Sequence, residues 1–239
     1  AGARWDAVTA AAAEHGLAPI SGAAGTVGVV GYLLGGGLGP LARSHGFSSD
    51  YIESFTVVTG TGDVVIASQD HNSDLYWALR GGKGGLGIVT EVRLRLIELS
   101  TLYAGSLFFE EEHIEAALRG WIDWTATAHA QVSTSAAILS FPPLDFIPEP
   151  FRGRRLLHLR FAYPGSHEEG ETLAAPLRAF APIYMDMLGV LPVAGVASIH
   201  NDPCDPCPTW MEGTFGSSNY VPCRRSSTPK VDCCLTHAA

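Results

Sequence analysis

The stretch Gly28–Gly39 (GVVGYLLGGGLG) contains six glycines in twelve residues and decides how the N-terminal part of the chain can fold. Glycine lacks a Cβ, so this backbone can turn tightly and can approach a ligand within van der Waals distance. A flexible linker would be polar and rich in serine, whereas this stretch alternates its glycines with valine, leucine and tyrosine. We therefore expect the stretch to be buried and to form a ligand-binding loop whose N–H groups hold a pyrophosphate.

Three other interpretations of this glycine-rich region fail on chemical grounds. The uncharged stretch Leu17–Ala42 is long enough to span a bilayer, but its eight glycines and two prolines would weaken a helix. Residues 82–87 (GKGGLG) match the G-x-G-x-x-G pattern, but they follow a predicted helix and precede a predicted strand. That order is the reverse of the one in dinucleotide-binding folds. Lys83 is followed by glycine instead of serine or threonine, so a Walker A loop is excluded as well.

Hydrophobic periodicity around this region predicts a mixture of helices and antiparallel strands. Trp5, Val8 and Ala12 form the apolar face of the first helix. The predicted elements are a helix over 5–15, a hairpin with strands over 51–59 and 64–67, a helix over 74–80 capped by Asn72 or Ser73, and a strand over 88–99. His45, which lies close to the glycine tract, is expected to make structural hydrogen bonds.

From about residue 99 the pattern changes to the order strand, helix, strand, strand, helix, strand. The predicted elements cover 102–109, 111–130, 132–141, 155–163, 167–180 with a restart at Pro176, and 183–188. This order is the split β-α-β pattern of an antiparallel sheet that carries its helices on one face. Trp121 and Trp124 have helical spacing, so we expect them in the core.

Composition and charge limit the possible partners. The net charge of −9 argues against nucleic acid and against an anionic membrane surface, because both attract basic proteins. No charged segment followed by an apolar segment opens the chain, so no signal peptide is visible and a cytoplasmic location is expected. A small-molecule substrate is the partner expected, and the sequence leaves the oligomeric state open.

All five cysteines fall in the last 36 residues. Cys204 and Cys207 have the spacing of a zinc knuckle, but Cys223 and Cys233 do not form the second pair that a zinc ribbon needs. We therefore predict no metal site. Residues 201–239 have no periodicity and are expected to form an irregular tail, with a composition that a frame shift in a GC-rich gene would produce.

Four motifs stand in a fixed order within the first hundred residues: Thr26–Gly28 (TVG), Gly35–Gly39 (GGGLG), Asp74–Gly82 (DLYWALRGG) and Gly87–Thr90 (GIVT). In this order they resemble the FAD-linked oxidase family of vanillyl-alcohol oxidase and berberine bridge enzyme, in particular its bacterial and fungal berberine-bridge-like branch. The resemblance covers Gly2 to about Leu99. In that family this region is the second half of the PCMH-type FAD-binding domain.

The resemblance implies FAD as the cofactor and identifies candidate residues for binding it. Residues beside the flavin and the pyrophosphate would be Gly25, Thr26, Val27, Gly28, Gly31 and Tyr32. Close packing next to them would use Gly35, Gly36, Gly37 and Gly39, and backbone groups of Ile88 and Val89 would bind the adenosine end.

The chain also departs from the family pattern. Many relatives attach the flavin through a cysteine where this chain has Ala24, and a second attachment point, a histidine, would lie before Ala1. The closing segment that often carries the catalytic base is absent too, so the catalytic residues stay unassigned. We therefore expect noncovalent FAD and an incomplete member of the family.

The expected fold class is α+β. Residues 1–99 would be the second half of an FAD-binding domain, 100–200 part of a substrate domain with an antiparallel sheet, and 201–239 the tail. The expected function is that of an FAD-dependent oxidoreductase, an oxidase or a dehydrogenase acting on a small alcohol, sugar or amine, with little activity in this chain alone. The alternative is a non-catalytic remnant that folds without cofactor.

Overall fold

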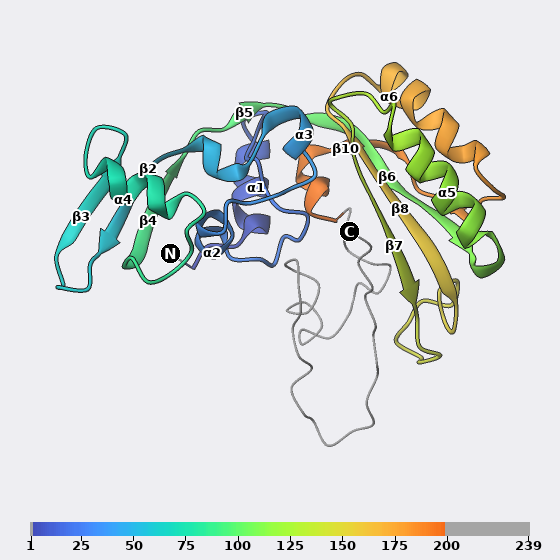
Figure 1. The fold of residues 1–239 in the computed structure, drawn as a ribbon, viewed down its shortest axis with the longest axis horizontal. Coiled ribbons are helices and arrows are strands. Elements are labelled where there is room, and N and C mark those ends of the chain that lie inside the picture. The colour runs from blue at the N-terminus through green and yellow to red at the C-terminus, as the bar shows by residue number, and fades with distance from the viewer. Residues whose placement is uncertain (1, 199–239) are drawn as a thin grey trace. The chain divides into compact units, whose positions relative to one another are not determined.

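The computed structural model describes residues 2–198, which form two compact units (Figure 1). The first unit comprises the described residues up to Thr101 together with Pro192–Ser198, and the second comprises Leu102–Leu191. The N–H of Val193 donates to the carbonyl of Ser100 at 2.9 Å. The segment where the chain leaves the first unit therefore lies next to the segment where it returns to that unit. The tail and the cysteines discussed above lie outside the described residues.

The first unit combines short helices with two small antiparallel sheets. Its elements are α1 (Trp5–Ala13), β1 (Leu17–Ala18), α2 (Val29–Leu34), α3 (Ala42–His45), η1 (Ser48–Tyr51), β2 (Ile52–Val58), β3 (Val64–Ser68), α4 (Ser73–Leu79), β4 (Ile88–Leu94), β5 (Ile97–Glu98) and η4 (Val193–Ser198). The strand order is β3-β2-β4 in one sheet, and β1 pairs with β5 in the other. The predicted helix over 5–15 and the predicted hairpin are confirmed.

One core holds these elements together. Trp5 of α1, Leu33 of α2 and Phe55 of β2 are almost fully buried in it, and Leu79 of α4 and Val89 of β4 complete the contacts. Alternation from Phe55 onward places Phe55 and Val57 on the core side, as the period of a strand requires, and a register shift between Ile52 and Ser54 brings Ile52 into the core as well. The helices and the three-stranded sheet therefore pack on the same apolar centre.

Three local predictions for this unit were wrong. The glycine tract contains a helix, α2, and is not buried throughout, because Leu38 is 72% exposed. The strand predicted over 88–99 breaks after Leu94, where the N–H of Arg95 donates to the carbonyl of Tyr51. Asn72 precedes α4 but does not cap it, because its side chain donates to the carbonyl of Ile66.

The second unit is a four-stranded antiparallel sheet with a short extra strand. Its elements are β6 (Thr101–Glu110), η2 (Glu111–His113), α5 (Ile114–Thr125), β7 (Ser133–Ser140), β8 (Arg155–Tyr163), α6 (His167–Ala174), η3 (Ala175–Ala179), β9 (Met185–Asp186) and β10 (Gly189–Pro192). The order β10-β6-β8-β7 places β8 between two strands joined by a helix, which is the predicted split pattern. The expected α+β fold class is confirmed.

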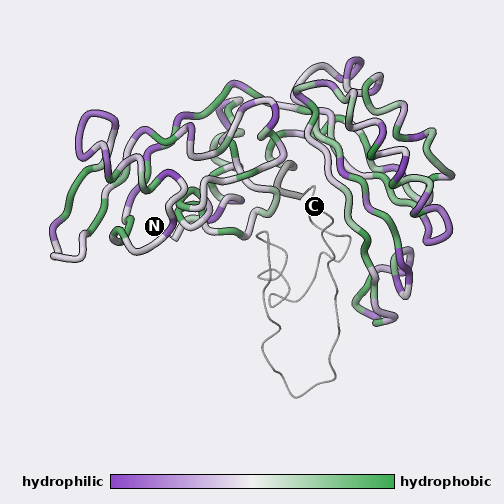
Figure 2. The backbone as a smooth tube through the Cα atoms, in the orientation of Figure 1, coloured by the Kyte–Doolittle hydropathy of each residue, from purple (hydrophilic) through white to green (hydrophobic). Residues whose placement is uncertain are grey.

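Both helices of this unit cover the same face of the sheet (Figure 1). Leu107, Leu159 and Phe161 on the strands pack against Ala117 of α5 and Ala174 of α6. Trp121 and Trp124 pack against this core, as predicted. Figure 2 shows long hydrophobic stretches along the strands of this unit, as expected for a sheet with a buried face.

Two boundaries in this unit differ from prediction. The helix predicted over 111–130 starts as a 3-10 turn and ends at Thr125, whose hydroxyl bonds the carbonyl of Ile122. Such side-chain bonds compete with helix continuation. The strand predicted over 183–188 is reduced to β9, and β10 follows it outside the predicted range. Between them Met187 and Leu188 cross closely over Gly105, where a Cβ would lie 2.1 Å from the carbonyl oxygen of Met187.

The sheet face without helices carries a buried polar pair. Nε2 of His158 lies 2.6 Å from Oγ of Ser106, and both residues are buried. The imidazole stacks on Phe108 at 4.5 Å with nearly parallel planes. Polar side chains on neighbouring strands therefore satisfy each other where water has no access.

We predict that Ser106→Ala lowers the free energy of unfolding by about 1–3 kcal/mol, because it leaves Nε2 of a buried histidine without its hydroxyl partner. Ser140→Ala is the matched control, because Ser140 is exposed at the end of β7, and it is expected to change stability by less than about 0.5 kcal/mol. Urea denaturation followed by circular dichroism measures both. Equal effects of the two substitutions would contradict the importance of the Ser106–His158 bond.

Candidate functional site

The segment that leads into α2 is held by the start of α1. The N–H of Trp5 donates to the carbonyl of Val27 at 3.1 Å, and the N–H of Asp6 donates to that of Gly25 at 2.9 Å. The N–H of Val29 in turn donates to the carbonyl of Ala3 at 3.0 Å. These bonds fix the predicted cofactor segment Gly25–Gly28 by its backbone, although its sequence has no regular structure of its own.

Helix α2 has one face made almost entirely of backbone. Gly28, Gly31 and Gly35 are exposed and follow the i, i+3, i+7 spacing of one helix face, while Val29 and Leu33 point into the core. A Cβ on Gly28 or Gly31 would meet no atom within 4 Å. Nothing in the packing of residues 2–198 therefore requires glycine at these two positions, and the open space leaves the helix backbone accessible to a flat ligand.

Other glycines of the tract make room for the chain's own side chains. A Cβ on Gly37 would lie 2.6 Å from Cβ of Ser48 and 2.7 Å from Cε1 of Tyr32. A Cβ on Gly39 would lie 2.1 Å from the carbonyl oxygen of Ser21. Real Cβ atoms do not approach so closely, so these positions need glycine for packing. Gly36, with φ of 93°, and Gly37, with φ of 76°, also adopt the left-handed backbone that favours glycine.

Tyr32 lies at the centre of these close contacts. Its ring packs edge-on against Trp5, with ring centroids 5.6 Å apart and planes at 87°. Its hydroxyl is buried and has no hydrogen-bond partner among the described residues. Burial raises the pKa of Tyr32 to about 12, because the phenolate would lose its hydration. A hydroxyl in this position is poorly suited to exchange protons with a substrate near neutral pH.

A second set of hydrogen bonds holds the end of the tract and was missed by the sequence analysis. The N–H groups of Ser48 and Ser49 donate to the carbonyls of Gly37 and Gly36, each at 2.9 Å. Nε of Arg80 donates to the carbonyl of Ser49 at 2.7 Å. The motif DLYWALRGG includes Arg80 and could have marked this residue as important. The motif does not show that Arg80 contacts residues about thirty positions earlier in the chain.

Arg80 also forms an ion pair. Its Nη2 lies 3.0 Å from Oδ1 of Asp50, whose Oδ2 accepts the N–H of Phe47. The guanidinium lies over the ring of Tyr76, 5.3 Å from its centroid. Helix α4 is thereby tied to η1, and η1 to the glycine tract.

The two predicted halves of the cofactor site share one core. Val89 is buried beside Val29 and Leu33, whereas Ile88 is 70% exposed at the start of β4. The N–H of Lys83 donates to the carbonyl of Leu34, which joins the second glycine loop to the end of α2. Val27 packs against this core as well, and Gly25 and Thr26 are half-buried.

One further sequence prediction concerns a group near the site. His45 makes the structural hydrogen bond expected of it, with Nδ1 at 2.8 Å from Oγ of Ser44, and burial lowers the pKa of His45.

Across residues 2–198 no three His, Cys, Asp or Glu side chains gather as metal ligands would. In the same residues, every helix is too short or too polar to cross a bilayer.

Comparisons with known proteins point to flavin chemistry. The family model described as "FAD binding domain" matches residues 1–68. FAD-linked oxidoreductase pgmH of Aspergillus terreus is 34% identical over 171 residues, which is 71% of this chain and 34% of that protein. (R)-6-hydroxynicotine oxidase of Paenarthrobacter nicotinovorans is 46% identical over 88 residues, 37% of this chain and 19% of that protein. The chain thus spans about a third or less of these relatives.

Solved structures agree with the fold. The crystal structure of 6-hydroxy-D-nicotine oxidase from Arthrobacter nicotinovorans superimposes with a TM-score of 0.71 at 25% identity, covering 91% of this chain and 45% of that one. The berberine-bridge-enzyme-like protein 1 of Physcomitrella patens gives a TM-score of 0.67 at 23% identity, covering 87% and 45%. The first match includes nearly all of both units described above.

We predict that Tyr32→Phe does not lower the stability at neutral pH, because it removes a buried hydroxyl that makes no hydrogen bond among the described residues and carries a cost of lost hydration. The unchanged chain should lose about 2–3 kcal/mol of unfolding free energy between about pH 10 and about pH 12. Over that range the unfolded tyrosine, with its pKa of 10.0, releases a proton that the folded one retains. Tyr32→Phe has no hydroxyl to titrate, so its unfolding free energy should not show this contribution to the decrease between about pH 10 and about pH 12.

Denaturation midpoints measured at several pH values check this difference. Tyr103 and Tyr163, whose pKa values burial also raises, are present in both proteins, so the comparison isolates Tyr32. Parallel loss of stability in the two proteins would contradict the burial of its hydroxyl.

Proposed function

We infer that this chain, which belongs to the FAD-linked oxidase family, supplies part of the cofactor surface of an FAD-dependent oxidoreductase. The observation that carries the inference is the exposed backbone face of α2, where Gly28 and Gly31 border open space. A cofactor lying on this face could contact the helix backbone directly, which any larger side chain would prevent.

The residues proposed to hold FAD are those that the resemblance identified. Gly25–Gly28, Gly31 and Tyr32 would lie beside the flavin and pyrophosphate, and the backbone of Ile88 and Val89 beside the adenosine. Gly35 continues the exposed face of α2, and a Cβ on Gly36 would also meet no atom within 4 Å. Gly37 and Gly39 act indirectly, because their missing side chains make room for Tyr32 and Ser21. This assignment separates glycines that face the ligand from glycines that shape the loop.

The proposed reaction is hydride removal from a small alcohol, sugar or amine. FAD, when bound, supplies the hydride acceptor, and the protein contributes position and a dry, ordered surface. The name of the relative (R)-6-hydroxynicotine oxidase supports a small organic substrate. We assign residues 102–191 to substrate binding on the basis of the family resemblance. Because the chain spans about a third or less of the length of the curated relatives it matches, we expect little turnover from these 239 residues alone.

We predict that the chain binds FAD and releases it on acid precipitation. Ala24 stands where relatives carry an attachment cysteine, and a methyl group cannot form a thioether. Equilibrium dialysis with FAD, followed by trichloroacetic acid and absorbance of the supernatant, measures both binding and release. Yellow colour retained in the pellet would contradict noncovalent attachment, and absence of any FAD binding would favour a remnant that folds without cofactor.

We predict opposite effects of Gly31→Ala on stability and on FAD binding. Alanine in the interior of α2 should stabilise the folded chain by about 0.5–1 kcal/mol, because glycine is a poor helix former and the added methyl meets no atom. The same methyl should weaken FAD binding roughly tenfold or more, since it occupies the space proposed for the cofactor.

Gly60→Ala serves as the control, because Gly60 also borders open space but lies in the β2–β3 turn. It should leave FAD binding unchanged. Thermal denaturation and fluorescence titration with FAD give the two readouts. Unchanged FAD affinity in Gly31→Ala would exclude the face of α2 as the cofactor surface.

A further inference from the structure

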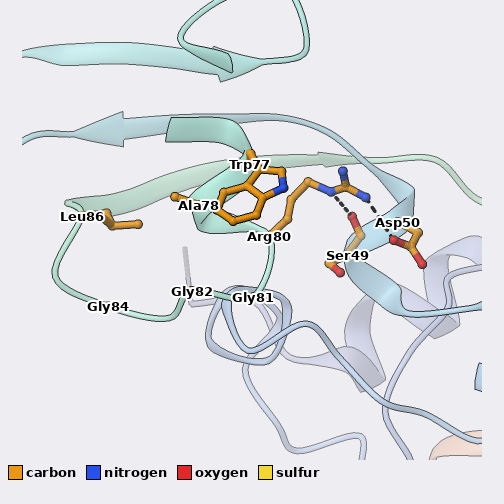
Figure 3. Close-up of a pocket in the computed structure, with 9 residues that line it drawn as sticks. All are labelled: Ser49, Asp50, Trp77, Ala78, Arg80, Gly81, Gly82, Gly84 and Leu86. Atoms are coloured by element: carbon orange, nitrogen blue, oxygen red, sulfur yellow. Dashed lines mark hydrogen bonds and ion pairs between the residues drawn. The ribbon is translucent and has the colours of Figure 1, made fainter. Parts of the chain in front are cut away.

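A pocket of about 610 Å³ lies beside α4 in the first unit, and none of its lining residues is among those proposed for FAD (Figure 3). Trp77 comes from α4, Arg80 directly follows that helix, and Ser49 and Asp50 come from η1. The loop from Gly81 to Leu86 completes the boundary. Its volume falls in the range of pockets that hold small organic molecules.

The apolar part of the pocket suits a flat ring. Trp77 is 78% exposed, which is unusual for a side chain of this size, and Leu86 is 39% exposed. Between them run Gly81, Gly82 and Gly84, which have no side chains to keep a ligand from the backbone. An aromatic ligand could therefore stack on the indole with its other edge near the loop.

The polar end of the pocket offers hydrogen-bond donors. Asp50 already uses both carboxylate oxygens, one with Arg80 and one with the N–H of Phe47. Arg80 uses Nε and Nη2, and its Nη1 has no partner within the described part of the chain. Figure 3 shows the guanidinium extended between Trp77 and the pair Ser49–Asp50.

These bonds fix the guanidinium in position. A fixed guanidinium with unused N–H groups favours an anion, because charge-assisted hydrogen bonds to carboxylate or phosphate are the strongest it can form. A cationic ligand would find the only nearby lining carboxylate, that of Asp50, already occupied.

We propose that this pocket binds a planar aromatic molecule that carries a carboxylate or a phosphate group. The ring lies against Trp77, and the anionic group reaches Arg80. The same chemistry occurs in a free aromatic acid and in the adenylate part of a nucleotide, so the experiment includes both.

The test is a titration of the 239-residue chain followed by tryptophan fluorescence, with benzoate and AMP as probes. Two further compounds are the controls: adenosine, which lacks the anionic group, and inorganic pyrophosphate, which lacks the aromatic ring. We expect saturable quenching by benzoate or AMP, and binding roughly tenfold weaker for adenosine and for pyrophosphate. Trp77→Leu should lower the affinity for AMP roughly tenfold in equilibrium dialysis, which does not depend on the fluorophore.

Two further variants separate binding from structure. Arg80→Gln should reduce the affinity for AMP to that for adenosine, and circular dichroism checks that the fold persists. Val64→Ala is the control, because Val64 is 69% exposed on β3 and does not line the pocket. It should bind AMP as the unchanged chain does.

The absence of saturable quenching by both probes, or equal AMP affinity in Trp77→Leu and the unchanged chain, would overturn the proposal. A competition arm with saturating FAD identifies the source of the ligand. Displacement of AMP would identify the pocket as the place of the cofactor's adenylate end, and simultaneous binding would identify a separate ligand; both results support the pocket. Failure of FAD to bind would contradict the proposed function and leave the titrations with AMP and benzoate interpretable.

Discussion

The packing of Tyr32 against glycine backbone is the constraint on which the rest of the first unit depends. The ring occupies space that a Cβ at Gly37 would take, and it contacts Trp5 on another side. Because Trp5 begins α1 and Tyr32 lies in α2, this contact sets the two helices against each other. Hydrogen bonds from Ser48 and Ser49 then hold the glycine turn that encloses the ring.

This arrangement divides one glycine tract into two kinds of position. At Gly37 and Gly39 a side chain would collide with atoms of the chain itself, so the fold requires glycine there. At Gly28 and Gly31 a Cβ would meet no atom of the described residues, and at Gly31, inside α2, glycine also weakens the helix. A residue that is unfavourable for local structure and unnecessary for packing is best explained by something that must lie against it.

Much of the architecture could be predicted from the sequence, because it follows from short-range patterns. The hairpin over 51–67 and the split β-α-β order follow from alternation and turn residues, which act between near neighbours. Helix α2 could not be predicted in this way, since a glycine-rich sequence has little helical propensity and only burial of Val29 and Leu33 makes the helix form. The hydrogen bond from Arg80 to the carbonyl of Ser49 could not be predicted either, because it joins residues 31 positions apart. The motifs identified Gly25–Gly39 as one candidate region, whereas the packing of Gly37 and Gly39 against Ser48, Tyr32 and Ser21 distinguishes positions within it and could not be predicted from the sequence.

The adjacency of Ser100 and Val193 has a consequence for how such proteins diversify. A unit whose two ends meet at neighbouring points can be exchanged for another of similar end spacing without rethreading the chain. Recombination at this junction would replace residues 102–191 as one unit and would leave the core around Trp5 and Phe55 unchanged. A different second unit could then be joined to the same first unit without any change in the core of that unit.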